Sequence, residues 1–422
     1  MVKLSVYLQN IVRIVAACMF GIGASNLYAL NPEQINDPLV KSLTVRNPEN
    51  FMAPPVIRLN TADRLDINFD IIGEDAEHLR YRLLHCNADW QPSRLLEQEY
   101  LKGFNEAEIE DYAFSSNTFI HYVNYNLEIP NSQMQPVAGG NYLLQVYREN
   151  YPDEILFQTG FYVSENTVTL QGDVTTRTDK GVDAGYQQVE LRVDAGGEEI
   201  RNPWQDLVVN VIQNNSPSSL RTTFHPLRVE GKVIEYAHDP NLIFPAGNEY
   251  RRFETVRTDY PGMHVDSVVF NGKMFEAYLT PDLPRAGKGY EYDRTQHGRF
   301  KIDDYNSTDA NLGADYVLTH FSLIMPYQPG ADIYPDGEFT RYNQDDANIM
   351  TYNHNSGRYE VKIPLKQGSY NYRYVMVAKG EATPSSSMIE GDRYESQNEY
   401  LALVYLRLPG ARADRLIGTS IF

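Results

Sequence analysis

The stretch HCNADWQPS at residues 85–93, with EYLKGF at 99–104 and YNLEIPN at 125–131, decides the expected fold of this chain. It reads as one long connection between two strands of a β-sandwich. Connections of this length inside a compact domain are uncommon, and they are usually functional or disordered. This one is too aromatic for disorder, and it carries Trp90, one of only two tryptophans. We therefore expect an ordered segment packed on a β core.

Short runs of alternating apolar and polar residues surround this stretch. Successive side chains of a strand point to opposite faces, so such alternation predicts half-buried strands. The runs lie at residues 66–71, 79–83, 122–129, 142–147 and 157–163. Five or more short strands in one domain predict a sandwich of the immunoglobulin type. The acidic segment 105–112 is the nearest candidate for a helix, of one or two turns.

The remainder of the chain repeats the same pattern. Residues 265–270 and 274–279 flank Asn271-Gly272, which predicts a hairpin, because both central residues of a type I′ turn need positive φ. A last group of strands is expected at residues 316–324, 359–365, 368–375 and 400–406. The predicted class is all-β, with tandem immunoglobulin-like and early-set β-sandwiches. Their expected boundaries are 30–165, 166–312 and 313–422.

Charge and cysteine content limit the function further. Residues 1–29 are typical of a signal peptide, with Lys3 and Arg13 beside an apolar run too short to span a bilayer. Removing this leader leaves Cys86 as the single cysteine, so we expect no intrachain disulfide. The formal net charge of −19 disfavours binding to nucleic acid and to anionic lipid. We expect an exported, soluble protein.

No pattern of residues indicates a reactive centre. His85 and Cys86 are adjacent in a predicted strand and should point to opposite faces, whereas a Cys/His nucleophile needs convergent neighbours. The nine histidines show no zinc-site spacing, and the acidic pairs at 303–304 and 345–346 lack a calcium-loop pattern. We expect no catalytic residue, no cofactor, no metal and no enzyme. A thiol hydrolase with His85 and Cys86 in its active site is the least favoured function.

The three blocks quoted first resemble, in their order, the first-domain signature of the type IX secretion system plug proteins of Bacteroidota. The resemblance implies a non-enzymatic plug that associates with the outer-membrane translocon barrel. Such a plug seals the periplasmic opening of the barrel when no substrate is in transit. It implies a periplasmic protein that has no transmembrane segment of its own. Trp90 and Phe104 are then candidates for the partner interface or for the core under the loop, with the core favoured for Trp90.

The last region also resembles the early-set sandwiches of glycogen-binding modules. In those modules a Gly-x-Phe-x-x-Trp turn precedes a Leu-x-x-Gly-x-Tyr-x-Tyr strand, and here GEFTRY at 337–342 precedes LKQGSYNY at 365–372. The resemblance places Tyr342 and Arg373 at the positions that contact glucan. A periplasmic or surface glycan-binding module is therefore the alternative function. The second tryptophan of those modules is missing, which favours a structural descendant.

Overall fold

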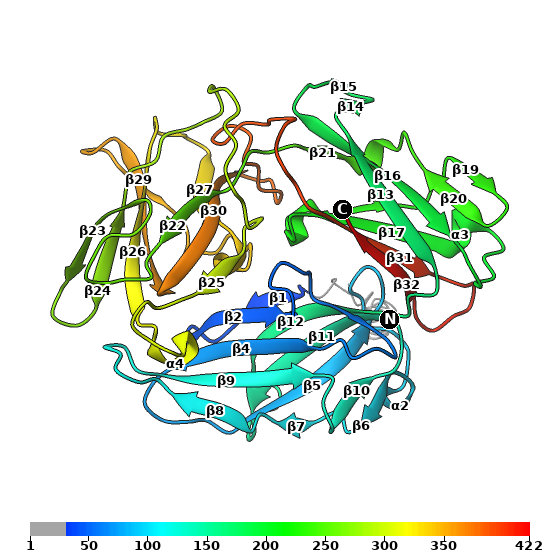
Figure 1. The fold of residues 1–422 in the computed structure, drawn as a ribbon, viewed down its shortest axis with the longest axis horizontal. Helices are drawn as coiled ribbons and strands as arrows, with labels where there is room; N and C mark the ends of the chain where they lie inside the picture. Colours follow the sequence, from blue (N-terminus) through cyan, green and yellow to red (C-terminus); the bar gives the residue numbers. More distant parts are fainter. Residues whose placement is uncertain (1–30) are drawn as a thin grey trace, which may run out of the picture.

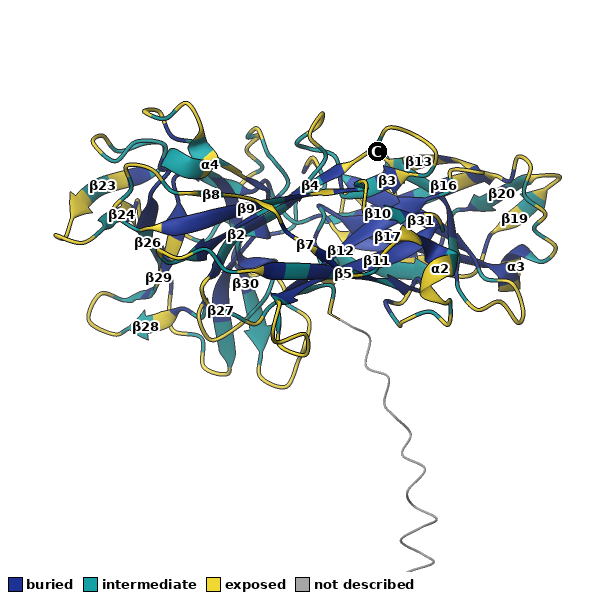
Figure 2. Cartoon of the chain, turned by 90° about the horizontal axis from the view of Figure 1, so that it is seen from below, coloured by how far each residue is buried: buried dark blue, intermediate teal, exposed yellow. Residues whose placement is uncertain are grey.

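The computed structural model describes residues 31–422, and the expected signal peptide lies outside the described residues. Nearly every element is a β-strand, which confirms the all-β class and the tandem sandwiches (Figure 1). The α-helices of the described residues are single turns: α2 (Glu97–Tyr100), α3 (Pro203–Asp206) and α4 (Ala310–Gly313). The strands form three bodies around a common centre, and the buried strands run through the middle of each (Figures 1 and 2).

The first body packs two sheets over one apolar core. Along β4 (Leu65–Ile72), the side chains of Leu65, Ile67 and Phe69 alternate inward and are fully buried, as the alternation predicts. One sheet contains β1 (Glu33–Ile35), β12 (Ile155–Ser164), β11 (Gly140–Arg148), β5 (Leu79–Cys86) and β7 (Ala107–Glu108), with β3 (Val56–Arg58) parallel beside β12. The other contains β2 (Val40–Arg46), β4 (Leu65–Ile72), β9 (Tyr122–Ile129) and β8 (Asp111–Phe114).

Residues 85–131, which were expected to form one long connection, contain several short strands and a helical turn. After β5 ends at Cys86, the chain forms α2, then β6 (Leu101–Gly103), which pairs with β10 (Met134–Pro136), and then β7 and β8. The helix expected at residues 105–112 is wrong. Ala107 and Ile109 are buried while Glu108 and Glu110 between and after them are exposed, which is the two-residue period of a strand.

The second body consists of two sheets and a short hairpin. One sheet contains β13 (Thr169–Thr175), β16 (Tyr186–Asp194), β20 (Val233–Tyr236) and β19 (Arg228–Glu230), with β21 (Ile243–Pro245) beside β16. The other contains β18 (Arg221–Thr223), β17 (Leu207–Gln213), β31 (Tyr400–Leu406) and β32 (Arg415–Ile421). The hairpin joins β14 (Arg177–Thr178) to β15 (Gly181–Val182). Valines and leucines of both sheets form a single core between them.

The third body has its own core, dominated by aromatic rings. Phe253, Phe300 and Tyr370 stack with centroid separations of 5.0 and 5.3 Å. One sheet contains β22 (Arg251–Glu254), β30 (Gly368–Ala378) and β25 (Phe300–Ile302), with β27 (Ala331–Asp336) also on β30. The other contains β23 (Val265–Phe270), β24 (Phe275–Leu279), β26 (Tyr316–Ile324), β29 (Arg358–Lys366) and β28 (Thr351–Asn353).

Strand pairing divides the chain differently from the boundary expected at 312/313. β22, β24 and β25, expected in the second sandwich, pair with β26 or β30 of the third body, and β23 pairs with β24. β31, expected to close the third sheet, pairs with β17 of the second body, and β32 follows it. Alternation identifies a strand but not its partner, since the partner depends on which apolar faces meet in three dimensions.

The hairpin at Asn271-Gly272 forms, but its turn is not the expected one. β23 and β24 pair in antiparallel fashion, and the backbone N–H of Asn271 donates to the carbonyl of Met274 at 3.1 Å. Gly272 has φ of 91°, whereas Asn271 is outside the left-handed region. The loop includes Lys273 and Met274, so the two-residue type I′ geometry is replaced by a longer turn.

Candidate functional site

His85 and Cys86 point to opposite faces of β5, as their adjacency predicts. The ring of His85 lies 5.1 Å from that of Tyr142, and its Nε2 donates to the Gly139 carbonyl at 3.2 Å. Burial lowers the pKa of His85. On the other face, burial raises the pKa of Cys86 to about 12, so its thiol is protonated at neutral pH. His121 is exposed beside Glu74, and no Cys/His pair forms among these residues.

Trp90 belongs to the contact between the first and second bodies. Its side chain is buried, and its ring centroid lies 5.6 Å from that of Tyr162. A Cβ at Gly160 would lie 2.4 Å from the Trp90 ring, so only glycine fits beneath it. The same apolar cluster includes Val208, Leu403 and other residues of the second body. Trp90 is therefore a buried plug under its loop rather than an exposed anchor.

Phe104 has the opposite environment. Its residue is 79% exposed in the segment between β6 and β7, and its backbone N–H donates to the Gln133 carbonyl at 3.1 Å. Next to it, the Asn105 side chain accepts a hydrogen bond from the backbone N–H of Leu83 at 2.9 Å. An ordered backbone thus presents an exposed ring, and Phe104 stays a candidate for partner contact.

Tyr342 and Arg373 do not form a sugar platform in this structure. Tyr342 is buried, and its hydroxyl donates to the Asn214 carbonyl of the second body at 3.4 Å. Arg373 donates through Nε to Asp336 Oδ2 at 3.0 Å, and its guanidinium lies 5.4 Å from the Tyr250 ring centroid. A glucan ring needs an exposed aromatic face, so these contacts favour the structural role for both residues.

Buried polar contacts join the first body to the third. Lys366 Nζ lies 2.7 Å from Asp70 Oδ2, and Tyr316 donates its hydroxyl hydrogen to the same oxygen at 2.6 Å. The carboxylate of Asp315 accepts the backbone N–H groups of Phe119 and Ile120 at 2.7 and 3.1 Å. A second ion pair between these bodies, Arg46 with Glu338, is nearly buried.

Hydrogen bonds near Ala88 join the first body to the second. The Ala88 backbone N–H donates to Asp414 Oδ2 at 3.1 Å, and the Ala88 carbonyl accepts from the Asn210 amide at 2.9 Å. Tyr405 donates to Asn141 Oδ1 at 2.6 Å across the same contact. Because buried polar groups that lose a partner are costly, these hydrogen bonds fix the two bodies to each other.

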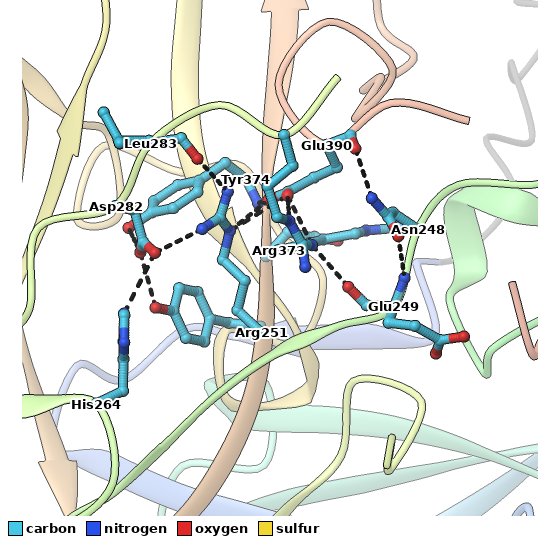
Figure 3. Close-up of polar contacts among 12 residues, drawn as sticks. Asn248, Glu249, Arg251, His264, Asp282, Leu283, Arg373, Tyr374 and Glu390 are labelled. Atoms are coloured by element: carbon cyan, nitrogen blue, oxygen red, sulfur yellow. Dashed lines mark hydrogen bonds and ion pairs between the residues drawn. The ribbon is translucent and has the colours of Figure 1, made fainter. Parts of the chain in front are cut away.

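A buried ionic cluster lies in the third body and is centred on Arg251 (Figure 3). Its guanidinium lies 2.5 Å from Asp282 Oδ1 and 3.0 Å from Glu390 Oε1. Glu390 also pairs with Arg285 at 2.7 Å. Burial alone would raise the pKa of Asp282, but His264 and Arg251 bring that pKa below its usual value. Both acids are matched by cations, so the cluster is a structural network.

The described residues hold no arrangement typical of a metal site. Within residues 31–422, no group of three or more His, Cys, Asp or Glu side chains is placed to hold a metal ion. The helices of that part of the chain are also too short and too polar to cross a membrane.

Two exposed rings and one half-buried ring gather where the first and third bodies meet, and we name Phe119, Phe270 and Phe275 the aromatic edge. The Phe119 and Phe270 centroids are 4.6 Å apart, and Phe275 lies 5.4 and 5.1 Å from them. Phe119 is 56% and Phe270 is 42% exposed. Phe270 ends β23, an edge strand of its sheet (Figure 2). Sequence reasoning missed this cluster because its members come from two bodies.

Comparisons with known proteins agree with this architecture. The family description "Type 9 secretion system plug protein 1st domain" matches residues 40–165. The crystal structure of a hypothetical protein from Parabacteroides merdae is 37% identical, with a TM-score of 0.90 over 92% of this chain and 98% of that chain. A serine-rich repeat adhesion glycoprotein from Streptococcus agalactiae aligns over 90% of this chain and 97% of that chain. Its identity is 7% and its TM-score 0.13, so it carries no argument. No curated protein matches.

The strands and the buried contacts between the three bodies define a protein of joined β-sandwiches with large aromatic side chains exposed on its surface. The family match and the likeness to the P. merdae protein then decide the family. The chain belongs to the type IX secretion system plug protein family. Membership indicates a plug-like role in type IX secretion, association with a component of that system, and a place in the cell envelope.

Proposed function

We propose that this chain is a non-enzymatic, periplasmic plug that associates with the outer-membrane translocon barrel of the type IX secretion system. It seals the periplasmic opening of the barrel when no substrate is in transit. The family match over residues 40–165 is the observation that carries the proposal. A wide barrel encloses a water-filled lumen, so an idle translocon leaks small solutes unless a stopper closes it.

The joined bodies suit this role physically. A stopper must keep its shape against a large opening, and relative motion of domains is the default unless their contact is extensive. Here the Lys366–Asp70 pair joins the first body to the third, and the Tyr405–Asn141 hydrogen bond joins it to the second. These buried contacts support a plug that acts as one rigid object.

The aromatic edge is the surface that we assign to contact with the barrel. Aromatic side chains are enriched in the centres of protein interfaces, where they dominate the binding energy. Phe119 and Phe270 are exposed although they are large and apolar. They stand at the meeting of two bodies whose backbones are held in place, since Asp315 binds the backbone of Phe119. Contact with a partner would remove their surface from water.

A permeability experiment tests the sealing role. Deleting the gene for this chain should raise the uptake of a small dye across the outer membrane in cells that contain the barrel. In cells that lack the barrel, the same deletion should leave uptake unchanged, because there is no opening to seal. Equal leakage in both backgrounds would show that the chain affects the envelope by another route, and it would overturn the proposal.

A further inference from the structure

A cavity of about 630 Å³ lies where the three bodies meet, and we name it the junction cavity. Its walls come from the start of the first body, the turn at residues 88–90, strands β17 and β18, and the segment 338–342 of the third body. Most of the wall is apolar or aromatic, with these residues among those that line it: Ala88, Trp90, Tyr162, Ile212, Leu220 and Phe224. Concave, mainly apolar pockets of this size at domain contacts are typical ligand sites.

Several residues around the junction cavity have a costly backbone conformation. Trp90, Asn215, Arg341 and Tyr342 all line it, and each has φ between 53° and 61°. The left-handed region is unfavourable for residues other than glycine and asparagine, so Trp90, Arg341 and Tyr342 are the costly positions among them. Such residues cluster at ligand clamps and switch regions. Their concentration here indicates that the cavity wall is held in shape for a purpose other than stability.

Charges on the wall select the chemistry of the ligand. Glu33 pairs with Arg341, Glu338 with Arg46, and Arg407 with Asp414. Asp89 is exposed at the cavity and has no ion-pair partner among the described residues, where its Oδ1 accepts only the Gln91 backbone N–H at 3.1 Å. The Arg407 guanidinium of the same wall interacts with the Asp89 carboxylate, but its ion pair is with Asp414, so the Asp89 carboxylate favours a cationic group of the ligand at the rim.

Arg341 also favours a ligand that carries a neutral hydrogen-bond acceptor. Its terminal nitrogens donate to the Leu43 carbonyl and to Thr159 Oγ1 at 3.3 and 2.8 Å. Its Nε is buried and has no hydrogen-bond partner in the described part of the chain. A buried N–H without an acceptor is costly. An anion is disfavoured by the nearby Glu33 and Glu338, whereas a peptide carbonyl supplies an acceptor without adding charge.

We propose that the junction cavity binds a short polypeptide segment in which a large apolar side chain stands next to a basic residue. The apolar side chain packs against Trp90 and Tyr162, the basic group pairs with Asp89, and a backbone carbonyl of the segment accepts from Arg341. This inference goes beyond the proposed sealing role and does not depend on it, because it concerns a different surface from the aromatic edge.

Trp90 provides the signal for a direct test on the full chain. The chain has two tryptophans, so a Trp204→Phe variant leaves Trp90 as the single indole fluorophore. Titration with the peptide acetyl-Lys-Phe-Leu-Lys-amide should shift the Trp90 emission in a saturable manner. The peptides acetyl-Glu-Phe-Leu-Glu-amide and acetyl-Lys-Ser-Ser-Lys-amide should bind at least tenfold more weakly, since each lacks one of the two features.

Matched variants in the Trp204→Phe background locate the binding. Leu220→Phe narrows the cavity and should weaken binding at least tenfold, whereas Leu227→Phe, an exposed position of the same body, should not. Asp89→Asn should weaken binding severalfold, whereas Asp173→Asn on the exposed face of β13 should not. Phe224→Ser, at an exposed lining position, gives a second wall variant that leaves the core intact.

Three outcomes would overturn the proposal. The first is the lack of a saturable change with the Lys-Phe-Leu-Lys peptide while the variant melts like the parent protein. The second is undiminished binding in both Leu220→Phe and Phe224→Ser, which would place the peptide elsewhere. The third is equally tight binding of dodecyltrimethylammonium, which is a cationic amphiphile without carbonyl groups. None of these results bears on dye uptake, so failure here is distinct from failure of the sealing role.

Discussion

Lys366 Nζ lies 2.7 Å from Asp70 Oδ2 in a contact that buries both side chains completely, one on β29 of the third body and one on β4 of the first. Burial lowers the pKa of Lys366, although Asp70 opposes that shift. Asn124 donates to the second Asp70 oxygen at 2.8 Å, and the ammonium lies 4.0 Å from the Tyr122 ring centroid. The pair is thus fully solvated by protein groups, as a buried ion pair must be.

Removing one partner of this pair should destabilise the protein strongly. Asp70→Asn leaves the buried ammonium without its counter-charge, and Lys366→Met leaves the carboxylate alone. We expect each to lower the free energy of unfolding by about 3–5 kcal/mol, and the double variant to lose less than the sum of the two. Denaturant melts of the four proteins measure this coupling. The exposed Arg58–Asp63 pair is the control, with an expected loss of about 1 kcal/mol or less for Arg58→Gln. Additive losses at Asp70 and Lys366 would contradict the prediction.

Trp90→Ala should be the most damaging tryptophan substitution. The change opens a cavity between the first and second bodies, where Trp90 packs on Gly160 and Tyr162, and such truncations cost about 3–5 kcal/mol. Trp204 is 47% exposed, so we expect Trp204→Ala to cost about 0.5 kcal/mol or less. Thermal melts of both variants against the parent protein measure the difference. Similar melting of the two variants would mean that Trp90 does not hold the bodies together.

The sequence predicted the strands well and their partners poorly. The predicted strand ranges 316–324 and 400–406 match β26 and β31, because the pattern of apolar and polar residues is a local property. The return of β31 to β17 is a non-local choice between apolar faces of similar character, and no local pattern encodes it. Asp70 and Lys366 lie in strands as ordinary polar residues, so their pairing across two bodies could not be inferred. The separation of the His85 and Cys86 side chains was predictable, because adjacent strand residues face opposite ways.

The Cys86 thiol should resist alkylation in the folded protein. Burial raises its pKa to about 12, so about one thiol in ten thousand is ionised at pH 8, and the reactive species is the thiolate. In a Cys18→Ser variant, which leaves Cys86 as the single thiol, we expect iodoacetamide to alkylate Cys86 only after the chain is unfolded in denaturant. Rapid reaction in native buffer would show that the site opens readily.

The raised pKa of Cys86 also determines how the stability of the protein changes with pH. The unfolded chain releases the Cys86 proton near its ordinary pKa of 9.0, whereas the folded chain holds it up to about pH 12. The folded state therefore binds more protons between these values, and its stability must fall as pH rises through that window, by up to about 1.4 kcal/mol per pH unit. A Cys86→Ala variant removes this component. Its stability should decline less steeply than that of the parent above pH 9, and parallel curves would contradict the assignment.

Single substitutions in the aromatic edge test the proposed contact with the barrel. Phe119→Ser and Phe270→Ser remove exposed rings without opening the core, so melting temperatures should change little. If these rings dominate the contact, each variant should co-purify with the translocon barrel from detergent-solubilised membranes at least tenfold less efficiently, a loss of about 1.4 kcal/mol or more. Tyr151→Ser, at an equally exposed ring of the first body, is the control and should co-purify normally. Normal recovery of both phenylalanine variants would move the contact to another surface, and Phe104→Ser, at the most exposed phenylalanine of the first body, would then be the next variant to measure.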